Sequence, residues 1–134
     1  MNTLSKTDPF HANIHPRARK GIELFNKGEY FDAHEELEGA WLETGSPERY
    51  LYQGILQIGL AYYQISRGNY GGAIKMFKRG QRNLGPLGDS MLGINIGQLR
   101  EDASAVEREL RAKGQERIGE IQPYQYKPLP LIEY

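Results

Sequence analysis

The chain of 134 residues contains no cysteine. This absence excludes disulfide bonds, cysteine nucleophiles, iron–sulfur clusters and cysteine zinc sites. Long apolar runs are lacking too: the longest uncharged stretch, Tyr50–Ser66, contains three glutamines and is too short to span a bilayer. The first fifteen residues have no apolar core of a signal peptide. We therefore expect a cytoplasmic protein without membrane association.

An excess of charge of one sign is also missing. Lys and Arg number 17 and Asp and Glu number 17, so the formal net charge is zero. Dedicated nucleic-acid binders carry a basic excess, so a nucleic-acid partner is not expected. Four basic residues still share one face of a predicted helix: Lys75, Lys78, Arg79 and Arg82. Such a face is usually solvated or paired with carboxylates, and an anion or RNA patch is the alternative.

The remaining composition, 39% hydrophobic and 25% charged, is typical of one globular domain. Apolar residues recur at helical spacing throughout, and no segment alternates well enough to predict a sheet. Glycine and proline positions predict helices over about 16–27, 30–43, 47–67 and 70–83, followed by an amphipathic fifth helix with Ile96, Leu99, Ala103, Val106 and Leu110 on its apolar stripe. The predicted fold is all-α: a single-domain bundle of about five helices, with a loose arm over 1–15, the bundle over 16–113 and an extended, proline-rich strap over 114–134.

An internal repeat supports two stacked antiparallel helix hairpins. Residues 25–37 align with residues 65–77 at an offset of 40, sharing Gly, Tyr and Ala. In each unit the glycine ends one helix, the tyrosine fills the turn and the alanine permits close packing. This is similar to the helix pair of tetratricopeptide repeats. The residues expected to shape the turns and the packing are Gly28, Tyr30, Ala33, Gly68, Asn69, Tyr70, Gly72 and Ala73. Asn69 is expected to cap the fourth helix and Ser46 the third.

The third predicted helix is apolar almost all round, which is typical of a central helix packed on several sides. Its one polar seam consists of Gln53, Gln57 and Gln64 and is bordered by Arg49. Because Gln53 and Gln57 are four residues apart, they project together.

The second predicted helix carries ionisable groups where an apolar face is expected. At 100° per residue, His34 and Glu38 fall inside the apolar arc between Trp41 and Phe31, with Glu35 at its edge. Unpaired charges in an apolar interior cost several kcal/mol, so these groups should have partners or a ligand. One hypothesis is a buried network with glutamine, Arg49 or tyrosine partners. The other is a pocket for a small polar ligand or acid–base chemistry, lined by His34, Glu35, Glu38, Trp41, Arg49, Gln53 and Gln57.

A divalent metal held by His34 and Glu38 is a further alternative, although no cofactor is expected. The helix supplies His34-Glu35-x-x-Glu38 and lacks the second histidine of a zinc-protease helix. His11 and His15 approach only if the arm folds back. In an acid–base enzyme His34 would be the base and Glu38 would orient it. No nucleophile for acyl transfer is evident.

Three motifs carry a family resemblance. They are Phe31-Asp32-Ala33-His34-Glu35 with Glu38 and Trp41, then Gln53-Gly54-Ile55-Leu56-Gln57, then Gly68-Asn69-Tyr70-Gly71-Gly72-Ala73. Together they resemble the prokaryotic family called domain of unknown function 309, over roughly residues 20–85. Asp32 stands where the family pattern has Glu. The resemblance implies a small all-helical intracellular domain and a shared His–Glu–Gln–Trp site, and it assigns no activity.

The functional expectation is therefore an uncharacterised helical domain with a small-ligand-binding or scaffold role. A metal-dependent or acid–base enzyme using the same helix is the second hypothesis. A protein or RNA adaptor that uses the basic fourth helix or the tail is the third. A homo-oligomer is compatible with all of them.

Overall fold

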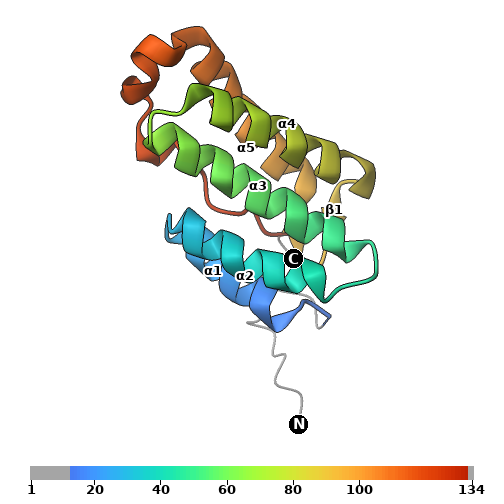
Figure 1. Cartoon of the computed structure of the whole chain (residues 1–134). Helices are drawn as coiled ribbons and strands as arrows, with labels where there is room; N and C mark the ends of the chain where they lie inside the picture. The colour runs from blue at the N-terminus through green and yellow to red at the C-terminus, as the bar shows by residue number, and fades with distance from the viewer. Residues whose placement is uncertain (1–12, 133–134) are drawn as a thin grey trace.

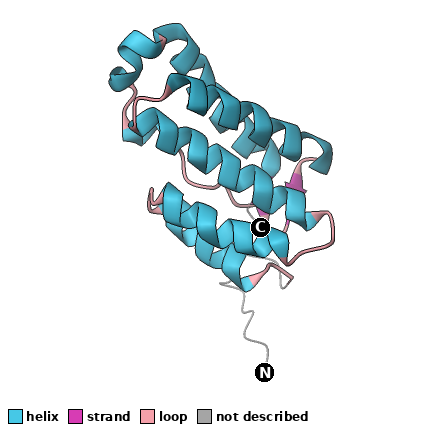
Figure 2. Ribbon diagram, in the orientation of Figure 1, coloured by secondary structure: helices cyan, strands magenta, loops and turns pink. Residues whose placement is uncertain are grey.

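The computed structural model describes residues 13–132 and is helical throughout its bundle (Figure 2). Its α-helices are α1 (Pro16–Asn26), α2 (Tyr30–Leu42), α3 (Glu48–Ser66), α4 (Tyr70–Leu84) and α5 (Ile96–Lys113). The 3-10 helices are η1 (Gly85–Leu87), η2 (Gln115–Glu120) and η3 (Pro123–Gln125), and the strands are β1 (Ser90–Met91) and β2 (Ile94–Asn95). The all-α prediction is confirmed. The small antiparallel β1–β2 hairpin was not predicted, because two residues per strand are too few to show an alternating pattern.

The helices α2, α3 and α4 lie side by side with α3 in the middle, and α1 packs on α2 (Figure 1). Helix α5 and the last described residues pass behind this layer (Figure 1). The central position explains the apolar surface of α3, which buries ten of its nineteen residues. Between Leu51 and Tyr62 of α3, only Gln53, Gln57 and Leu60 are partly open, and they form one stripe. No helix within residues 13–132 is long and apolar enough to cross a membrane.

The two hairpins α1–α2 and α3–α4 are built with the same turn. Gly28 and Gly68 adopt φ values of 79° and 75°, which glycine tolerates and other residues rarely do. The amide that follows each glycine donates at 2.9 Å to the carbonyl five residues earlier, in the pairs Glu29–Leu24 and Asn69–Gln64. The repeat seen in the sequence therefore corresponds to a repeated turn geometry.

The capping residues behave differently at α3 and α4. The Asn69 side-chain oxygen accepts a hydrogen bond from the Gly72 amide at 2.9 Å, as a helix cap does. The expected cap by Ser46 is wrong, because Pro47 occupies the cap position of α3 and no side chain caps it. The carbonyl of Ser46 instead accepts from the Arg49 amide at 3.0 Å.

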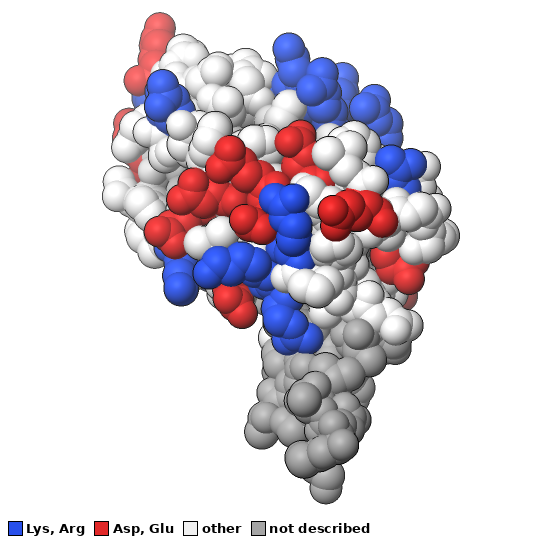
Figure 3. All heavy atoms as spheres, turned by 60° about the horizontal axis from the view of Figure 1, so that its bottom comes forward, with Lys and Arg blue, Asp and Glu red and all other residues white. Residues whose placement is uncertain are grey.

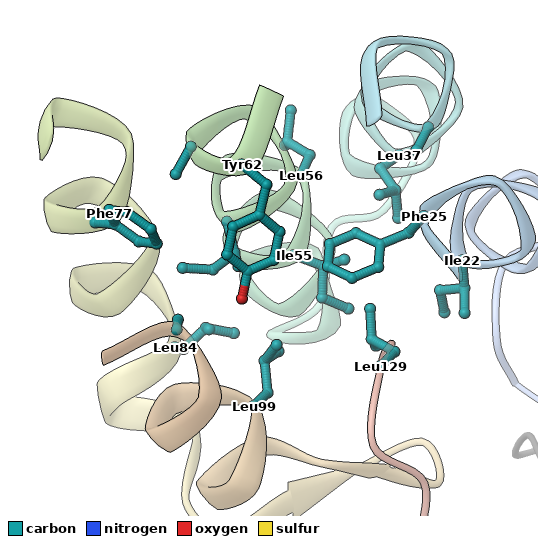
Figure 4. Close-up of a cluster of buried hydrophobic side chains, with 14 of the residues drawn as sticks. Ile22, Phe25, Leu37, Ile55, Leu56, Tyr62, Phe77, Leu84, Leu99 and Leu129 are labelled. Atoms are coloured by element: carbon teal, nitrogen blue, oxygen red, sulfur yellow. The ribbon is translucent and has the colours of Figure 1, made fainter. Parts of the chain in front are cut away.

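The C-terminal segment packs back on the bundle. The strap predicted over 114–134 contains the short helices η2 and η3, and its last described residues, 126–132, run without a helix. Tyr126 stacks on Tyr62 of α3 with ring centroids 4.9 Å apart, and the Leu129 amide donates to the Asn26 side chain at 2.8 Å. Leu129 lies beside Ile22 and Phe25 in the core (Figure 4). The strap therefore completes the core along α1 and α3.

The predicted loose arm, with His11, lies outside the described residues apart from positions 13–15. His15 precedes α1 and caps it, since its Nδ1 accepts from the Arg17 amide at 3.0 Å. Its Nε2 lies 2.7 Å from a Glu43 carboxylate oxygen. His15 is thus engaged at the start of α1.

Candidate functional site

A groove lies over the exposed stripe of α3, between α2 and α4. It has a volume of about 210 Å³ and is open to solvent. We call it the α2–α4 groove. Its lining consists of His34, Glu38 and Trp41 from α2, Gln53, Leu56, Gln57 and Leu60 from α3, and Met76 and Arg79 from α4. Five of the seven predicted site residues therefore line one groove.

Helical spacing brings these side chains together. His34, Glu38 and Trp41 stand at positions i, i+4 and i+7, which share one face of α2. The α3 side chains Gln53 and Gln57 repeat the first of these spacings. Because α2, α3 and α4 lie side by side, this face of α2 adjoins the α3 stripe. Helix α4 forms the opposite wall of the groove.

The burial expected for the α2 charges is wrong. Glu38 is exposed and His34 is only partly buried, and apart from tyrosines, residues 13–132 contain no buried polar or charged side chain. The face of α2 that packs is narrower than its apolar arc: Ala33, Leu37 and Ala40 are buried, whereas Phe31 is 47% exposed and Leu42 is 68% exposed. The two ionisable side chains lie at the open edge of that arc.

The buried network, one of the two hypotheses for these residues, is absent from the described part of the chain. His34 Nδ1 lies 3.2 Å from the Phe31 carbonyl, so Nδ1 donates and Nε2 is left available. The Gln57 side-chain oxygen accepts from Asn83 at 2.7 Å. None of the hydrogen bonds between described residues joins His34 or Glu38 to Gln53, Gln57 or Arg49. The polar groups of the groove therefore keep free donors and acceptors.

Two predicted site residues, Glu35 and Arg49, lie outside the groove lining. Glu35 is exposed on α2, and its backbone carbonyl accepts from Arg17 at 3.1 Å. The Arg49 guanidinium lies 5.3 Å from the Trp41 ring centroid and 5.6 Å from that of Tyr50, both within cation–π range. Arg49 therefore packs over the Trp41 ring.

A metal ion finds few ligands here. Among residues 13–132, no three His, Asp or Glu side chains lie close enough together to hold one. The two metal candidates, His34 and Glu38, remain a pair on one helix face.

Opposite charges face each other across the α2–α4 groove without pairing. Glu38 on α2 and Arg79 on α4 both line it, yet neither forms an ion pair among the described residues. One hypothesis from the sequence was that the basic residues of α4 pair with carboxylates. In the described part of the chain they form no ion pair with the carboxylates of α2. In the view of Figure 3, acidic side chains gather in the middle of the surface with basic side chains beside and between them, and a further basic group lies at the upper right.

Comparison with known proteins gives a family for this part of the chain. Residues 18–76 match the family model described as "Domain of unknown function (DUF309)". These residues are a DUF309 domain. An uncharacterized protein of Aquifex aeolicus (strain VF5) is 27% identical over 77 residues, which cover 57% of this chain and 23% of that protein. The match thus spans about a quarter of that relative.

The DUF309 domain contains every α2 and α3 residue of the groove, and Met76 is its last residue. Arg79 lies three residues beyond the match. The sequence reasoning missed Met76 and Arg79 as lining residues. Their signal was the amphipathic pattern of α4: with Ala73, Phe77 and Gly80 buried, Met76 and Arg79 fall on the side toward α3.

Proposed function

We propose that this DUF309 domain is a ligand-binding domain, and that the α2–α4 groove holds a small zwitterion of amino-acid size. The observation that supports this most directly is the pair of unpaired opposite charges, Glu38 and Arg79, on facing walls of one groove. A cationic group of the ligand would lie near the carboxylate of Glu38. Its anionic group would lie near the guanidinium of Arg79, which favours carboxylates.

The size and chemistry of the groove support the same ligand class. Its volume of about 210 Å³ is below the roughly 300–1,000 Å³ of sites for drug-sized ligands. Trp41, Leu60 and Met76 supply apolar wall, and the amides of Gln53 and Gln57 supply directional donors and acceptors between the two charges. A small molecule with two opposite charges and a short apolar part matches this lining.

Binding is favoured over acid–base catalysis because of how His34 is held. Its ring is oriented by the Phe31 carbonyl, so it does not need the orienting role that the enzyme hypothesis gave to Glu38. The groove is also open to water, which weakens the electrostatic interactions on which a catalyst depends.

The fluorescence of Trp41 can report ligand binding, because Trp41 is the only tryptophan in the chain and it lines the groove. We expect free α-amino acids to change its fluorescence in a saturable way. N-acetylated and C-amidated analogues, which each lack one charge, should bind at least about tenfold more weakly. Equal binding of the parent and both analogues would contradict the proposal, as would the absence of any saturable signal across the series.

Matched variants test the two walls. Glu38→Gln and Arg79→Gln should each weaken binding by at least about 1.4 kcal/mol, or tenfold. Glu35→Gln and Lys78→Gln remove the same charges from the same helices but outside the groove lining, so they should leave the affinity unchanged. Loss of affinity in the control variants to the same degree would show a long-range charge effect and no site.

A further inference from the structure

The outer surfaces of α2, α3 and α4 form one face with a graded charge. We call it the front face; it lies on the side of α3 away from Tyr126 and the strap. On α2 it presents the exposed Glu35 and Glu38, and on α3 the uncharged amides Gln53, Gln57 and Gln64. On α4 it presents the exposed Lys75, Arg79 and Arg82. Across three neighbouring helices the charge therefore runs from negative through neutral to positive.

These charges are unsatisfied within the chain. Other ionisable residues in the described part do pair, as Arg17 does with Glu36 at 3.0 Å and Arg111 with Glu107 at 2.9 Å. The front-face carboxylates and cations have no such partners among residues 13–132. The reason is geometric: neighbouring helix axes are about 8–10 Å apart, so α2 and α4 are separated by the width of α3.

We propose that the front face binds a second copy of this chain in a closed two-fold dimer. A two-fold axis parallel to α3 reverses the order of the helices in the partner. The acidic surface of α2 then meets the partner's basic α4, and the basic surface of α4 meets the partner's acidic α2. An axis lying in the face at right angles to α3 would set like charges against each other. The charge gradient is thus self-complementary for one symmetry only.

The front face also has the apolar content and extent of an interface. Tyr50 is 44% exposed, Phe31 is exposed, and Leu60 and Met76 are partly open. Helix α2 has 13 residues, so the face is about 20 Å long and about 28 Å wide, on the order of 560 Å² in projection. This is the scale of the roughly 800 Å² of accessible surface that each partner buries in a standard interface. An apolar centre with charged margins is the usual anatomy of such an interface.

Dimerisation would complete the α2–α4 groove. Because the groove lies over α3, next to the proposed axis, two copies of it face each other. Each open groove is then covered by the partner's front face. The inference does not rest on the proposed ligand, since it uses the charge gradient and the exposed apolar residues alone.

Sedimentation velocity of the full chain tests the dimer. We expect a dimer with a micromolar dissociation constant in about 50 mM salt, and a clear shift toward monomer in about 500 mM salt as the charges are screened. The mass should stop at two chains as concentration rises, because the interface is closed. A monomer at every concentration in low salt would overturn the proposal, and so would growth beyond the dimer.

A charge-swap pair tests the geometry. Lys75→Glu/Arg82→Glu makes both margins of the face acidic, and Glu35→Lys reverses the charge of an exposed residue on the α2 margin. Each variant alone should dimerise more weakly than the parent chain, and the double variant at least about 100-fold more weakly. Mixed together, they should form a heterodimer, because the acidic α4 margin of the first meets the reversed charge on the α2 margin of the second. Failure of the mixture to associate, with both variants folded by circular dichroism, would overturn the proposed axis.

The control variant Lys20→Glu/Arg108→Glu makes the same charge change at exposed positions of α1 and α5, outside the front face. It should dimerise like the parent, and a loss of its dimer equal to that of Lys75→Glu/Arg82→Glu would overturn the assignment. A chain that stays monomeric but binds a homopolymeric RNA through Lys75 and Arg82 would favour a polyanion over a second copy. Glu38 and Arg79 are unchanged in all these variants. The Trp41 titration of the monomeric variants therefore tests the ligand separately from the dimer.

Discussion

The hydroxyl of Tyr62 lies in the core without a hydrogen-bond partner among the described residues. The side chain is fully buried between the rings of Phe25 and Phe77, and its oxygen points toward Leu84 and Leu99 (Figure 4). Burial, together with nearby Tyr30, raises the pKa of Tyr62 far above its ordinary value. An unsatisfied buried hydroxyl carries a desolvation cost with no compensating bond.

Tyr62→Phe should therefore stabilise the protein, by about 1–2 kcal/mol, because it removes the unsatisfied group and keeps the ring. Urea unfolding followed by circular dichroism measures the change. Tyr52 is the matched control on the same helix: it is 1% exposed, but its hydroxyl accepts from the His15 amide at 3.0 Å. Tyr52→Phe should destabilise by about 1 kcal/mol. If Tyr62→Phe destabilises the protein as Tyr52→Phe does, the hydroxyl of Tyr62 has a partner.

The α2 residues show how far sequence reasoning reaches at this scale. Angular position on a helix predicts which residues share a face, and it places His34, Glu38 and Trp41 together in the groove. It does not predict how much of an apolar arc the neighbours cover, because that depends on where α3 lies. The exposure of Glu38 is the consequence.

Close packing of α3 on α4 depends on glycines at their contact. A Cβ atom on Gly54 would lie 2.6 Å from Cγ of Leu84, which is fully buried and cannot move aside. A Cβ on Gly80 would lie 2.7 Å from Ile58 Cδ1 and 3.3 Å from the Gly54 carbonyl oxygen. Both glycines lower helix propensity, and the gain is a short distance between the two helices.

Gly54→Ala should accordingly destabilise the protein by about 1–2 kcal/mol, since the overpacking outweighs the gain in helix propensity. Thermal unfolding provides the measurement. In α4, Gly71 has no atom within 4 Å of its potential Cβ, so Gly71→Ala is the control and should stabilise by up to about 1 kcal/mol. An unchanged melting temperature for Gly54→Ala would mean that the two helices can separate at little cost.

The bounds of the helices were predicted more accurately than the site or the long-range contacts. Gly28, Gly68 and Pro47 mark helix ends through backbone conformation alone, so the first four helix bounds agree with the sequence within one residue. The β1–β2 hairpin depends instead on a distant segment: Ile94 bridges to Leu131, and the Asn95 amide donates to the Pro130 carbonyl. No local pattern contains such a contact.

Three tyrosines join α2, α3 and the C-terminal strap. Tyr30 of α2, Tyr62 of α3 and Tyr126 of the strap pack together, with ring centroids 4.9–6.2 Å apart. Burial raises the pKa of all three phenols above the ordinary value of 10.0, and that of Tyr30 to about 12, with a smaller contribution from Tyr126. The cluster must stay neutral to remain packed.

Global stability should thus be independent of these tyrosines below about pH 10 and fall as pH rises toward about 12. The sign follows because the unfolded chain releases the phenol protons at its lower pKa, which favours unfolding once the pH exceeds that value. Urea midpoints at about pH 9, 10 and 11 provide the test, with absorbance at 295 nm reporting phenolate. In the Tyr126→Phe variant the decline should be shallower. A midpoint that does not change up to pH 11 would contradict the neutral cluster.

The bond from the Leu129 amide to Asn26 joins positions 103 residues apart. During synthesis, the side chain of Asn26 leaves the ribosome long before its partner exists. The two hairpins can form from neighbouring residues as they emerge, but the side of the core opposite the groove is covered only when the strap arrives. Because the strap is synthesised last, its contact with α1 forms among the last steps of folding during translation.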